Sequence, residues 1–477
     1  MDFYGHIIDG VEVPSLDGAT MPDIDPYTRE QWATVACGGQ ADADLAVQAA
    51  RRAFDEGPWP RMGYEKRQAI MHRLADLMDE HADELALADT RDMGKPITQA
   101  HHDVSRSSWN VRFFADHARM SASEAYPMDS GHHAYTRFDP TGVAVAISPW
   151  NFPLMLGTWK VMPALAWGNT VVWKPAEDTP VSATLVGRLA LEAGMPPGVL
   201  NVVHGYGPDS AGSALTSSPD VDRITFTGES GTGKIISGAA SKHLVPVSLE
   251  LGGKGANIVF DDAELDNAVH WAVQAIFRNA GQICLSGSRL YLQSGIYDEF
   301  VERFVAAAEA LKDGDPKDPS TEFPLALASE EHFTKVSGYL DTVAQDGGRL
   351  ATGGLGEGWS VKPTIILDAP PSARVCREEI FGPVCVVQRF DTEDEVVHAA
   401  NDTRYGLNAM VFTENLSRAH RVAARLRAGT VWVNCFFIRD LRAPFGGVGD
   451  SGVGREGGNF SREFFTEPKA VIMQISD

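Results

Sequence analysis

The feature that most constrains the fold is an alternation of short β-rich runs with helical stretches, which begins near Gly142. The β-rich runs are VAVAIS, NTVVWK, LNVVHG, DRITFTG and NIVF. Two strands that pair in parallel need a crossover between them, usually a helix, so this alternation is typical of parallel βαβ units. The sequence therefore predicts an α/β fold.

A second alternating region covers roughly residues 284–440, with β-rich runs such as PVCVVQRF and GTVWVN, and predicts a second α/β unit. The 477 residues exceed one ordinary hydrophobic core and contain no repeat or long linker, so we expect two or three closely packed units. Apolar residues at helical spacing predict amphipathic helices within residues 42–56 and 64–93, with Gly94 as a stop, and later at 268–278, 296–311, 329–345, 392–400 and 417–426.

The charge balance excludes some classes of partner. Lys and Arg total 41 against 64 Asp and Glu, which gives a formal net charge of −23. This excess of acid argues against a nucleic-acid or anionic-membrane partner. No segment approaches the run of about eighteen apolar residues that spans a membrane, and the first residues lack a basic region leading into an apolar one. We therefore expect a cytoplasmic protein.

The cysteines suggest chemistry rather than structure. Five cysteines, an odd number without zinc-type spacing, favour neither a disulfide framework nor a metal site. Cys284, in RNAGQICLSGSRL, lies just beyond an expected helix, and Gly281, Gly287 and other small neighbours permit close approach. These surroundings suit a nucleophilic thiol. A buried structural cysteine is the alternative, and this motif alone favours it.

Three more segments offer chemical groups. Glu250, in SLELGGKGANIVF, follows a strand-like run and either activates water or forms an ion pair with Lys254. Asn151, in ISPWNFPLMLGTWK, is either a preorganised donor to an oxyanion or an ordinary turn residue. TFTGESGTGK joins a β-run to a helix expected near Ser230, so its backbone N–H groups either bind phosphate or form a simple turn.

Taken together, these motifs resemble those of the aldehyde dehydrogenase superfamily. Their order along the chain is PWN, KPAE, FTG, LELGGK, a GQxC cysteine, EEIFGPV and PFGG, and the resemblance covers essentially the whole chain. It implies a Rossmann-like NAD-binding domain (residues 1–117 and 141–249), a catalytic α/β domain (250–440) and a small β extension for oligomerisation (118–140 and 456–477). It also implies a homodimer or homotetramer that acts on a small-molecule aldehyde.

The resemblance assigns catalytic roles by position. Cys284 attacks the aldehyde, and the side-chain amide of Asn151 and the Cys284 backbone N–H hold the resulting oxyanion. Glu250 activates the water that hydrolyses the thioester, so the product is a carboxylate. Lys160 and Glu467 match positions behind Glu250 that relay its proton. An ordinary ion pair is the alternative for these two residues.

The resemblance also implies a cofactor site. Lys174 and Glu177 match positions that hold the adenosine ribose, where a carboxylate repels a 2′-phosphate, so NAD is favoured over NADP. Glu379 and Phe381 are expected near the nicotinamide. Glu229 departs from the small residue usual after FTG and places an anion near the expected pyrophosphate. The remaining cofactor positions are Trp150, Gly228, Ser230, Gly233 and Leu251.

The substrate class is suggested by NCFFIRDLRAPFGG (residues 434–447). This form resembles the branch that oxidises 2-hydroxymuconic and 2-aminomuconic semialdehydes from aromatic-ring catabolism. There, the arginine corresponding to Arg439 acts with a second arginine, for which Arg106 and Arg112 are both candidates. Two guanidinium groups in one pocket suit a substrate carboxylate, and Phe437 suits a planar conjugated chain. An internal ion pair of Arg439 with Asp440 or with another nearby acid is the alternative.

Other activities remain as alternatives. The same chemistry can act on a succinic-type or aromatic aldehyde. A CoA-acylating enzyme is disfavoured because such relatives generally lack a glutamate corresponding to Glu250. A non-catalytic protein that reuses the fold is disfavoured because Cys284, Glu250 and Asn151 are dispensable without chemistry.

Overall fold

Two open sheets organise the molecule. The computed structural model describes residues 2–475. The first sheet has eight strands in the order β22-β12-β11-β8-β9-β10-β2-β3, and its central strands are parallel. The strands are β2 (His6–Ile8), β3 (Val11–Val13), β8 (Val143–Ile147), β9 (Thr170–Lys174), β10 (Leu200–Val202), β11 (Arg223–Thr227), β12 (Val247–Glu250) and β22 (Gly452–Val453).

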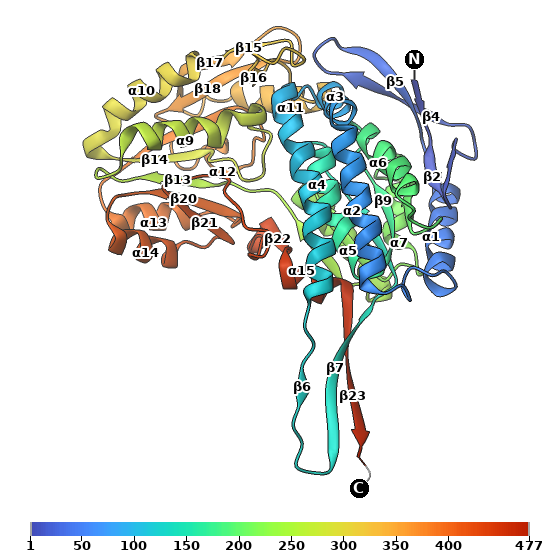
Figure 1. Cartoon of the computed structure of the whole chain (residues 1–477). Helices are drawn as coiled ribbons and strands as arrows, with labels where there is room; N and C mark the ends of the chain where they lie inside the picture. The colour runs from blue at the N-terminus through green and yellow to red at the C-terminus, as the bar shows by residue number, and fades with distance from the viewer. Residues whose placement is uncertain (1, 476–477) are drawn as a thin grey trace.

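The second sheet has seven strands in the order β17-β18-β19-β14-β13-β20-β21, all parallel except the β17–β18 pair. Figure 1 shows the two sheets in separate lobes that lie side by side. The predicted α/β fold, with two parallel sheets, is confirmed. The strands are β13 (Ala256–Val259), β14 (Arg289–Gln293), β17 (Arg349–Leu355), β18 (Val361–Leu367), β19 (Val384–Phe390), β20 (Asn408–Phe412) and β21 (Thr430–Val433).

Helices surround both sheets. Every residue of β8 and β9 is buried, as expected for parallel strands that are covered on both faces and read as continuous apolar runs. The helices of the first lobe are α1 (Gln40–Asp55), α2 (Tyr64–Glu80), α3 (Ala82–Met93), α4 (Ile97–Met120), α5 (Pro153–Ala166), α6 (Val181–Glu192), α7 (Ala211–Ser217), α8 (Ser230–Ala240) and α15 (Gly458–Phe465). Those of the second are α9 (Leu265–Phe277), α10 (Tyr297–Glu309), α11 (Glu330–Leu340), α12 (Arg374–Arg377), α13 (Glu393–Asn401) and α14 (Leu416–Arg425).

The helical stretch predicted over residues 64–93 is two helices. At His81 the backbone leaves the helical region (φ −102°, ψ 24°), so α2 ends and α3 begins in a new direction. Both helices pack on α4 and on α6, and the break lets α3 also pack on β4. Gly94 ends α3 in the left-handed conformation, as the sequence predicted.

Smaller sheets complete the fold. One joins β1 (Asp2–Tyr4), β5 (Glu30–Ala36) and β4 (Thr20–Asp25), and another joins β15 (Asp313–Gly314) to β16 (Phe323–Pro324). Short 3₁₀ turns occur at Ser241–His243, Arg278–Gly281, Ser294–Ile296 and Gly449–Ser451. No helix within residues 2–475 combines the length and the apolar character needed to cross a membrane.

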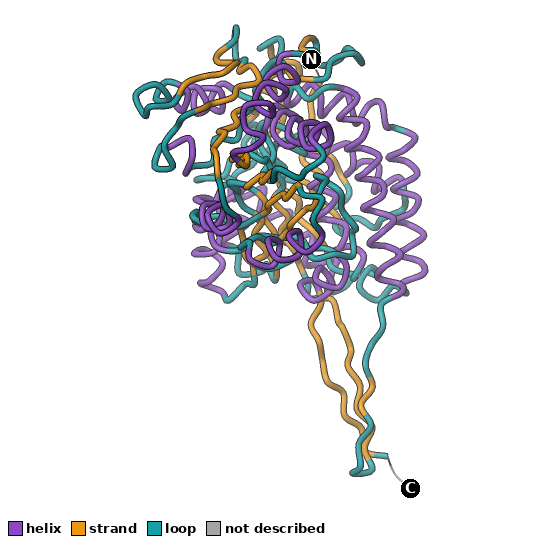
Figure 2. Tube along the Cα trace, turned by 90° about the vertical axis from the view of Figure 1, so that its left-hand side faces the viewer, coloured by secondary structure: helices purple, strands orange, loops and turns teal. Residues whose placement is uncertain are grey.

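A narrow arm projects from the first lobe (Figures 1 and 2). It consists of β23 (Thr466–Gln474), β7 (His132–Pro140) and β6 (Ala125–Tyr126), with β23 and β7 paired antiparallel along their whole length. The extension predicted for residues 456–477 begins too early, because α15 packs on α5 in the body and the arm strand starts at Thr466. The chain also returns to the first sheet through β22, beyond the predicted end of the catalytic domain at residue 440.

Candidate active site

A strained loop carries Cys284. Asn279 and Ala280 (φ 51° each) and Gly281 (φ 67°) all adopt the left-handed conformation, which is uncommon for a residue with a side chain. Packing enforces the bend, since a Cβ at Gly281 would lie 2.1 Å from the carbonyl oxygen of Gly382. The Asn279 side-chain amide also donates a 3.0 Å hydrogen bond to the Asn151 carbonyl. The loop is therefore fixed in shape before a substrate arrives.

Asn151 lies against the same loop. It follows β8, and its Nδ2 donates a 2.8 Å hydrogen bond to the carbonyl oxygen of Gln282. The side chain is buried, so its amide is held in one orientation within the Cys284 loop. A fixed donor in a water-poor site can stabilise an oxyanion formed at Cys284 without reorganising.

The thiol of Cys284 is protonated in this environment. Burial raises its pKa to about 12, and the carboxyl groups of Glu379 and Glu250 act in the same direction, whereas Arg439 opposes them. A thiol with so high a pKa is neutral at pH 7 and becomes a nucleophile only when a base takes its proton. The site therefore needs a base within reach of Cys284.

Glu250 is a buried carboxyl group whose charge affects the pKa of Cys284. It ends β12, is 4% exposed, and neither carboxyl oxygen has a hydrogen-bond partner within the described chain. Burial, followed by the charge of Glu456, raises the pKa of Glu250 well above its usual range. The glycine of PFGG lies close by, because a Cβ at Gly446 would be 2.7 Å from Glu250 Oε1. A buried carboxyl group without partners is typical of a functional site.

The ion pair behind Glu250 involves Lys160 and Glu456. Lys160 Nζ donates hydrogen bonds to Glu456 Oε1 (2.8 Å) and to Thr225 Oγ1 (3.1 Å), and the Trp159 indole donates to Glu456 Oε2 (2.7 Å). Both partners are buried, and both affect the Glu250 pKa. The hydrogen bonds of this network can therefore change when Glu250 gains or loses a proton.

The prediction for Glu467 is wrong. Glu467 lies on β23 at the base of the arm, and its carboxylate pairs with Arg223 at the surface. The residue beside Lys160 is Glu456, which the sequence reasoning missed. A possible signal was the following pair, Gly457 and Gly458, whose φ values of 100° and 44° belong to a sharp bend at a buried position.

A pocket beside these groups contains the predicted arginines. It has a cavity volume of about 120 Å³. Arg439 lies between two aromatic rings, 4.7 Å from Trp159 and 3.8 Å from Phe445, and Arg106 stacks over Trp109 at 4.3 Å. The lining residues are His102, Asp103, Arg106, Asn110, Met155, Leu156, Trp159, Arg278, Phe437 and Arg439.

The two arginines lack acidic partners. Within residues 2–475 neither side chain forms an ion pair or hydrogen bond. Burial, and next the charge of Arg106, lowers the pKa of Arg439 to about 10. Their guanidinium groups therefore repel each other in a partly desolvated pocket, an arrangement that an anion relieves.

Two open alternatives are resolved by this geometry. Arg112 points to α2, where it pairs with Asp76 (2.7 Å) and Asp79 (2.8 Å), so Arg106 is the arginine in the pocket. Asp440 pairs with Arg442 at 2.6 Å rather than with Arg439.

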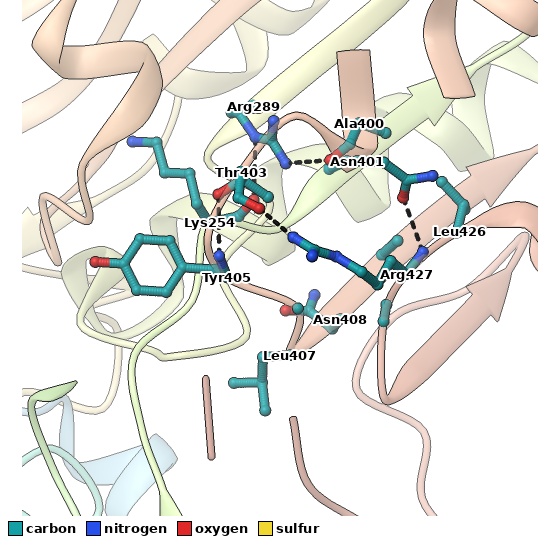
Figure 3. Close-up of a pocket in the computed structure, with 14 residues that line it drawn as sticks. Lys254, Arg289, Ala400, Asn401, Thr403, Tyr405, Leu407, Asn408, Leu426 and Arg427 are labelled. Carbon is teal, nitrogen blue, oxygen red and sulfur yellow. Dashed lines mark hydrogen bonds between the residues drawn. The ribbon is translucent and has the colours of Figure 1, made fainter. Parts of the chain in front are cut away.

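In a second pocket, the arginine side chains donate hydrogen bonds to backbone carbonyl oxygens (Figure 3). Arg289 donates to the carbonyl oxygens of Ala400 (2.8 Å) and Lys254 (3.0 Å), and Arg427 donates to that of Thr403. Those guanidinium groups stabilise loop backbone. The buried Arg289 therefore differs from the arginines beside Cys284, because its donors have hydrogen-bond partners.

The predicted cofactor residues gather at the carboxyl ends of the first sheet and the facing edge of the second lobe. Trp150 packs against Phe381, with ring centroids 5.3 Å apart, and Glu379 Oε1 accepts a 2.7 Å hydrogen bond from the Gly253 backbone. Lys174 Nζ, which is buried, donates to Glu177 Oε2 at 3.3 Å. This pair follows β9, where dinucleotide-binding sheets hold ribose.

The start of α8 fits a phosphate group. Gly228 and Gly233 are closely packed, since a Cβ would lie 2.3 Å from the Phe226 ring and 2.6 Å from Leu251, respectively. Gly231 in the first turn, by contrast, has open space beside it. Free backbone N–H groups and the helix dipole favour an anion there.

Two side chains at this helix start have partners in the protein. Ser230 Oγ donates to the Asp450 carbonyl oxygen at 2.7 Å. Glu229, expected to place an unwanted anion here, pairs instead with Lys335 of α11. This ion pair reduces the expected repulsion toward a pyrophosphate.

Comparison with known proteins agrees with this geometry. The model of the aldehyde dehydrogenase family matches residues 13–471. The chain is 48% identical to 2-hydroxymuconic semialdehyde dehydrogenase of Pseudomonas sp. (strain CF600), over 98% of this chain and 99% of that protein. It is 45% identical to the mitochondrial benzaldehyde dehydrogenase of Antirrhinum majus, over 99% and 89%. The crystal structure of PnpE in complex with nicotinamide adenine dinucleotide is 41% identical and superimposes with a TM-score of 0.96, over 99% and 98%. The chain belongs to the aldehyde dehydrogenase family, and it is an aldehyde-oxidising oxidoreductase that uses a nicotinamide cofactor.

Proposed function

We propose that this enzyme oxidises a muconic-type semialdehyde, with NAD as the cofactor, to the corresponding carboxylate. The observation that carries the proposal is the pair of unpaired arginines, Arg106 and Arg439, in a pocket beside Cys284. A carboxylate at the far end of the substrate would neutralise them. The similarity to a 2-hydroxymuconic semialdehyde dehydrogenase supports this substrate, whereas the nearly equal identity to a benzaldehyde dehydrogenase leaves an aromatic aldehyde as the second candidate.

The first half of the reaction forms a thioester. Cys284 loses its proton to Glu250 and its sulfur attacks the aldehyde carbon, so that a C–S bond forms and the carbonyl oxygen becomes negative. The Asn151 amide and the Cys284 backbone N–H hold this oxygen. Nicotinamide, held beside Trp150 and Glu379, would supply the acceptor for the hydride that leaves this carbon as its C=O bond is restored.

The second half releases the product. Glu250, deprotonated again, takes a proton from water while the water oxygen attacks the thioester carbon. The C–S bond breaks, which returns the sulfur of Cys284 and gives a carboxylate. Lys160 and Glu456 form an ion pair that affects the pKa of Glu250, so they can influence its gain and loss of a proton.

NAD is favoured over NADP by Glu177. This carboxylate lies beside Lys174 at the position expected to contact the ribose, where it would repel a 2′-phosphate. Ser230, Gly233 and Leu251 surround the start of α8, which suits the pyrophosphate.

Replacing Arg439 tests the substrate class. Arg439→Met keeps much of the apolar volume between Trp159 and Phe445 but removes the charge. We expect KM for a muconic-type semialdehyde to rise by about 10- to 100-fold, because one charge-assisted contact contributes about 1.5–3 kcal/mol. KM for a neutral aldehyde of similar size should stay within about threefold. Steady-state NADH formation over a panel of muconic, succinic and aromatic aldehydes measures both.

Arg442→Met is the matched control. Arg442 lies in the same segment but is exposed and paired with Asp440, so its loss should leave every KM unchanged. Equal losses of Arg439→Met on acidic and neutral aldehydes would reject the carboxylate-binding role.

We also propose that the arm joins subunits into a homodimer or homotetramer. Its edge strand β23 is exposed, with Ile472 at 62% and Met473 at 46% exposure, and a free strand edge with apolar residues favours pairing with another chain. Light scattering of Ile472→Lys at micromolar concentration should show a lower mass than the parent enzyme. Leu416→Lys, at an exposed apolar residue on α14, is the control. A parent enzyme that is monomeric under these conditions would contradict the proposal.

A further inference from the structure

The pocket contains a third arginine, which the sequence reasoning missed. Arg278 follows α9 and lies on the segment that leads to Cys284. It lines the same pocket as Arg106 and Arg439. Throughout residues 2–475 its side chain forms no ion pair or hydrogen bond, and its one aromatic contact is with the Phe437 ring, 5.3 Å from the guanidinium carbon.

The pocket has more positive charge than one substrate carboxylate can neutralise. Its lining includes one acidic residue, Asp103, and the Lys95 ammonium group already binds that carboxylate at 2.5 Å. Within residues 2–475, none of the three guanidinium groups therefore forms an ion pair with an acid of the pocket lining. Elsewhere in this acidic protein exposed arginines readily find carboxylates, as Arg303 does with Glu299 and Asp266. A partly buried excess of positive charge is unfavourable unless a ligand compensates for it.

Arg278 is held in place by aromatic packing. Phe437 adopts a left-handed backbone conformation (φ 65°), which is unusual for an aromatic residue and fixes the direction of its ring. That ring stacks on Phe152 at 6.2 Å, and Lys95 lies 4.1 Å from the centre of the Phe152 ring. The stack supports Arg278 through a cation–π contact while leaving its N–H donors free.

The three arginines occupy different parts of the pocket wall. Arg439 affects the pKa of both Glu250 and Cys284, so it lies toward the reacting end. Arg106 reaches the pocket from α4, and Arg278 reaches it from the end of α9 on the Phe437 side. Donors that approach from two helices and one loop can bind two separate anionic groups.

We propose that Arg278 binds a second carboxylate of the substrate, so that the preferred substrate is a semialdehyde with two carboxylates. The proposal rests on the proposed function, because it assumes that Arg106 and Arg439 hold the first carboxylate. It makes Arg278 a specificity-determining residue on the same segment as the nucleophile.

The test compares two semialdehydes that differ by one carboxylate: 2-hydroxymuconic semialdehyde and its carboxymethyl-substituted analogue. The parent enzyme should show a kcat/KM at least about tenfold higher for the analogue, as expected for one added charge-assisted contact. Arg278→Gln should raise KM for the analogue by about 10- to 100-fold and change KM for the one-carboxylate substrate by less than about threefold. Arg278→Lys should restore part of the preference, because it keeps the charge.

Controls separate this role from a structural one. Oxidation of a neutral aldehyde tests whether the Cys284 loop keeps its geometry. The kcat for this aldehyde should be unchanged in Arg278→Gln. Arg303→Gln, at an exposed paired arginine, should behave as the parent. A parent enzyme without preference for the analogue, or an equal loss on all three substrates, would overturn the proposal.

The same measurements distinguish the two hypotheses. If Arg439→Met weakens both acidic substrates while Arg278→Gln weakens neither, the proposed function stands and the role of Arg278 is rejected. If Arg439→Met weakens neither, the proposed function itself fails.

Discussion

Cys284→Ala is expected to lower kcat/KM for every aldehyde by at least about 10⁴-fold, because the reaction then has no nucleophile to form the thioester. The fold should be unaffected, since alanine fits the space of a thiol and Cys284 makes no disulfide. NADH formation at saturating aldehyde measures the loss. Binding of the cofactor, followed by protein fluorescence, should remain within about threefold of the parent, because no cofactor contact is assigned to the Cys284 sulfur.

Cys435→Ala is the matched control for the thiol. Cys435 is also a free, partly buried cysteine, but it lies in the segment before Arg439 and has no assigned role. Its replacement should leave kcat within about twofold, as expected for a small, non-disruptive change. Residual aldehyde oxidation by Cys284→Ala near the parent rate would show that the chemistry does not pass through this sulfur.

Glu250→Gln is expected to separate the two halves of the reaction. The loss of Glu250 should slow thioester hydrolysis by about 10²- to 10⁴-fold, and thiol ionisation, which Glu250 also assists in the proposed reaction, should slow less because bulk water can accept the thiol proton. Rapid mixing should then show a burst of NADH of about one equivalent per active site, followed by a slow steady state. Absence of both burst and turnover would show that the thiol cannot ionise without Glu250, and unchanged turnover would remove Glu250 from the mechanism.

The pH dependence provides a second readout for Glu250. Burial raises the pKa of this carboxyl group, so it is protonated at low pH and becomes a base only as the pH rises through the raised pKa. Steady-state kcat of the parent should therefore increase with pH on its acidic side, and this limb should disappear in Glu250→Gln. Glu322→Gln, at an exposed glutamate that does not line the pocket, should keep the limb.

The sequence predicted most of the architecture because parallel sheets leave a strong pattern. The short β-rich runs at β8, β9, β11, β13 and β19 alternate with helical stretches, which favours parallel strands, and β8, β9 and β13 are buried at every position. The break at His81 was not predicted, because the apolar spacing continues through it and only tertiary packing on α4 and α6 makes two helices better than one.

The site was predicted in part, and the exceptions share one physical cause. Arg106 and Arg112 lie on the same helix, but only the position of α2 shows that Arg112 faces Asp76 and Asp79. Glu456 and Glu467 both follow PFGG, and the sequence does not show where the chain leaves the body. The direction of a side chain depends on neighbours that are distant in sequence, so local patterns cannot decide it.

The late return of the chain to the first sheet has a consequence for biosynthesis. β22 pairs with β12, and Glu456 supplies the counter-charge for Lys160, yet both come from the part of the chain that follows the whole second lobe. While the ribosome is still producing that lobe, Lys160 remains a buried cation without its partner and the first sheet has an open edge. We therefore expect the first lobe to stay loosely packed during translation and to become fully ordered only after residue 456 has emerged.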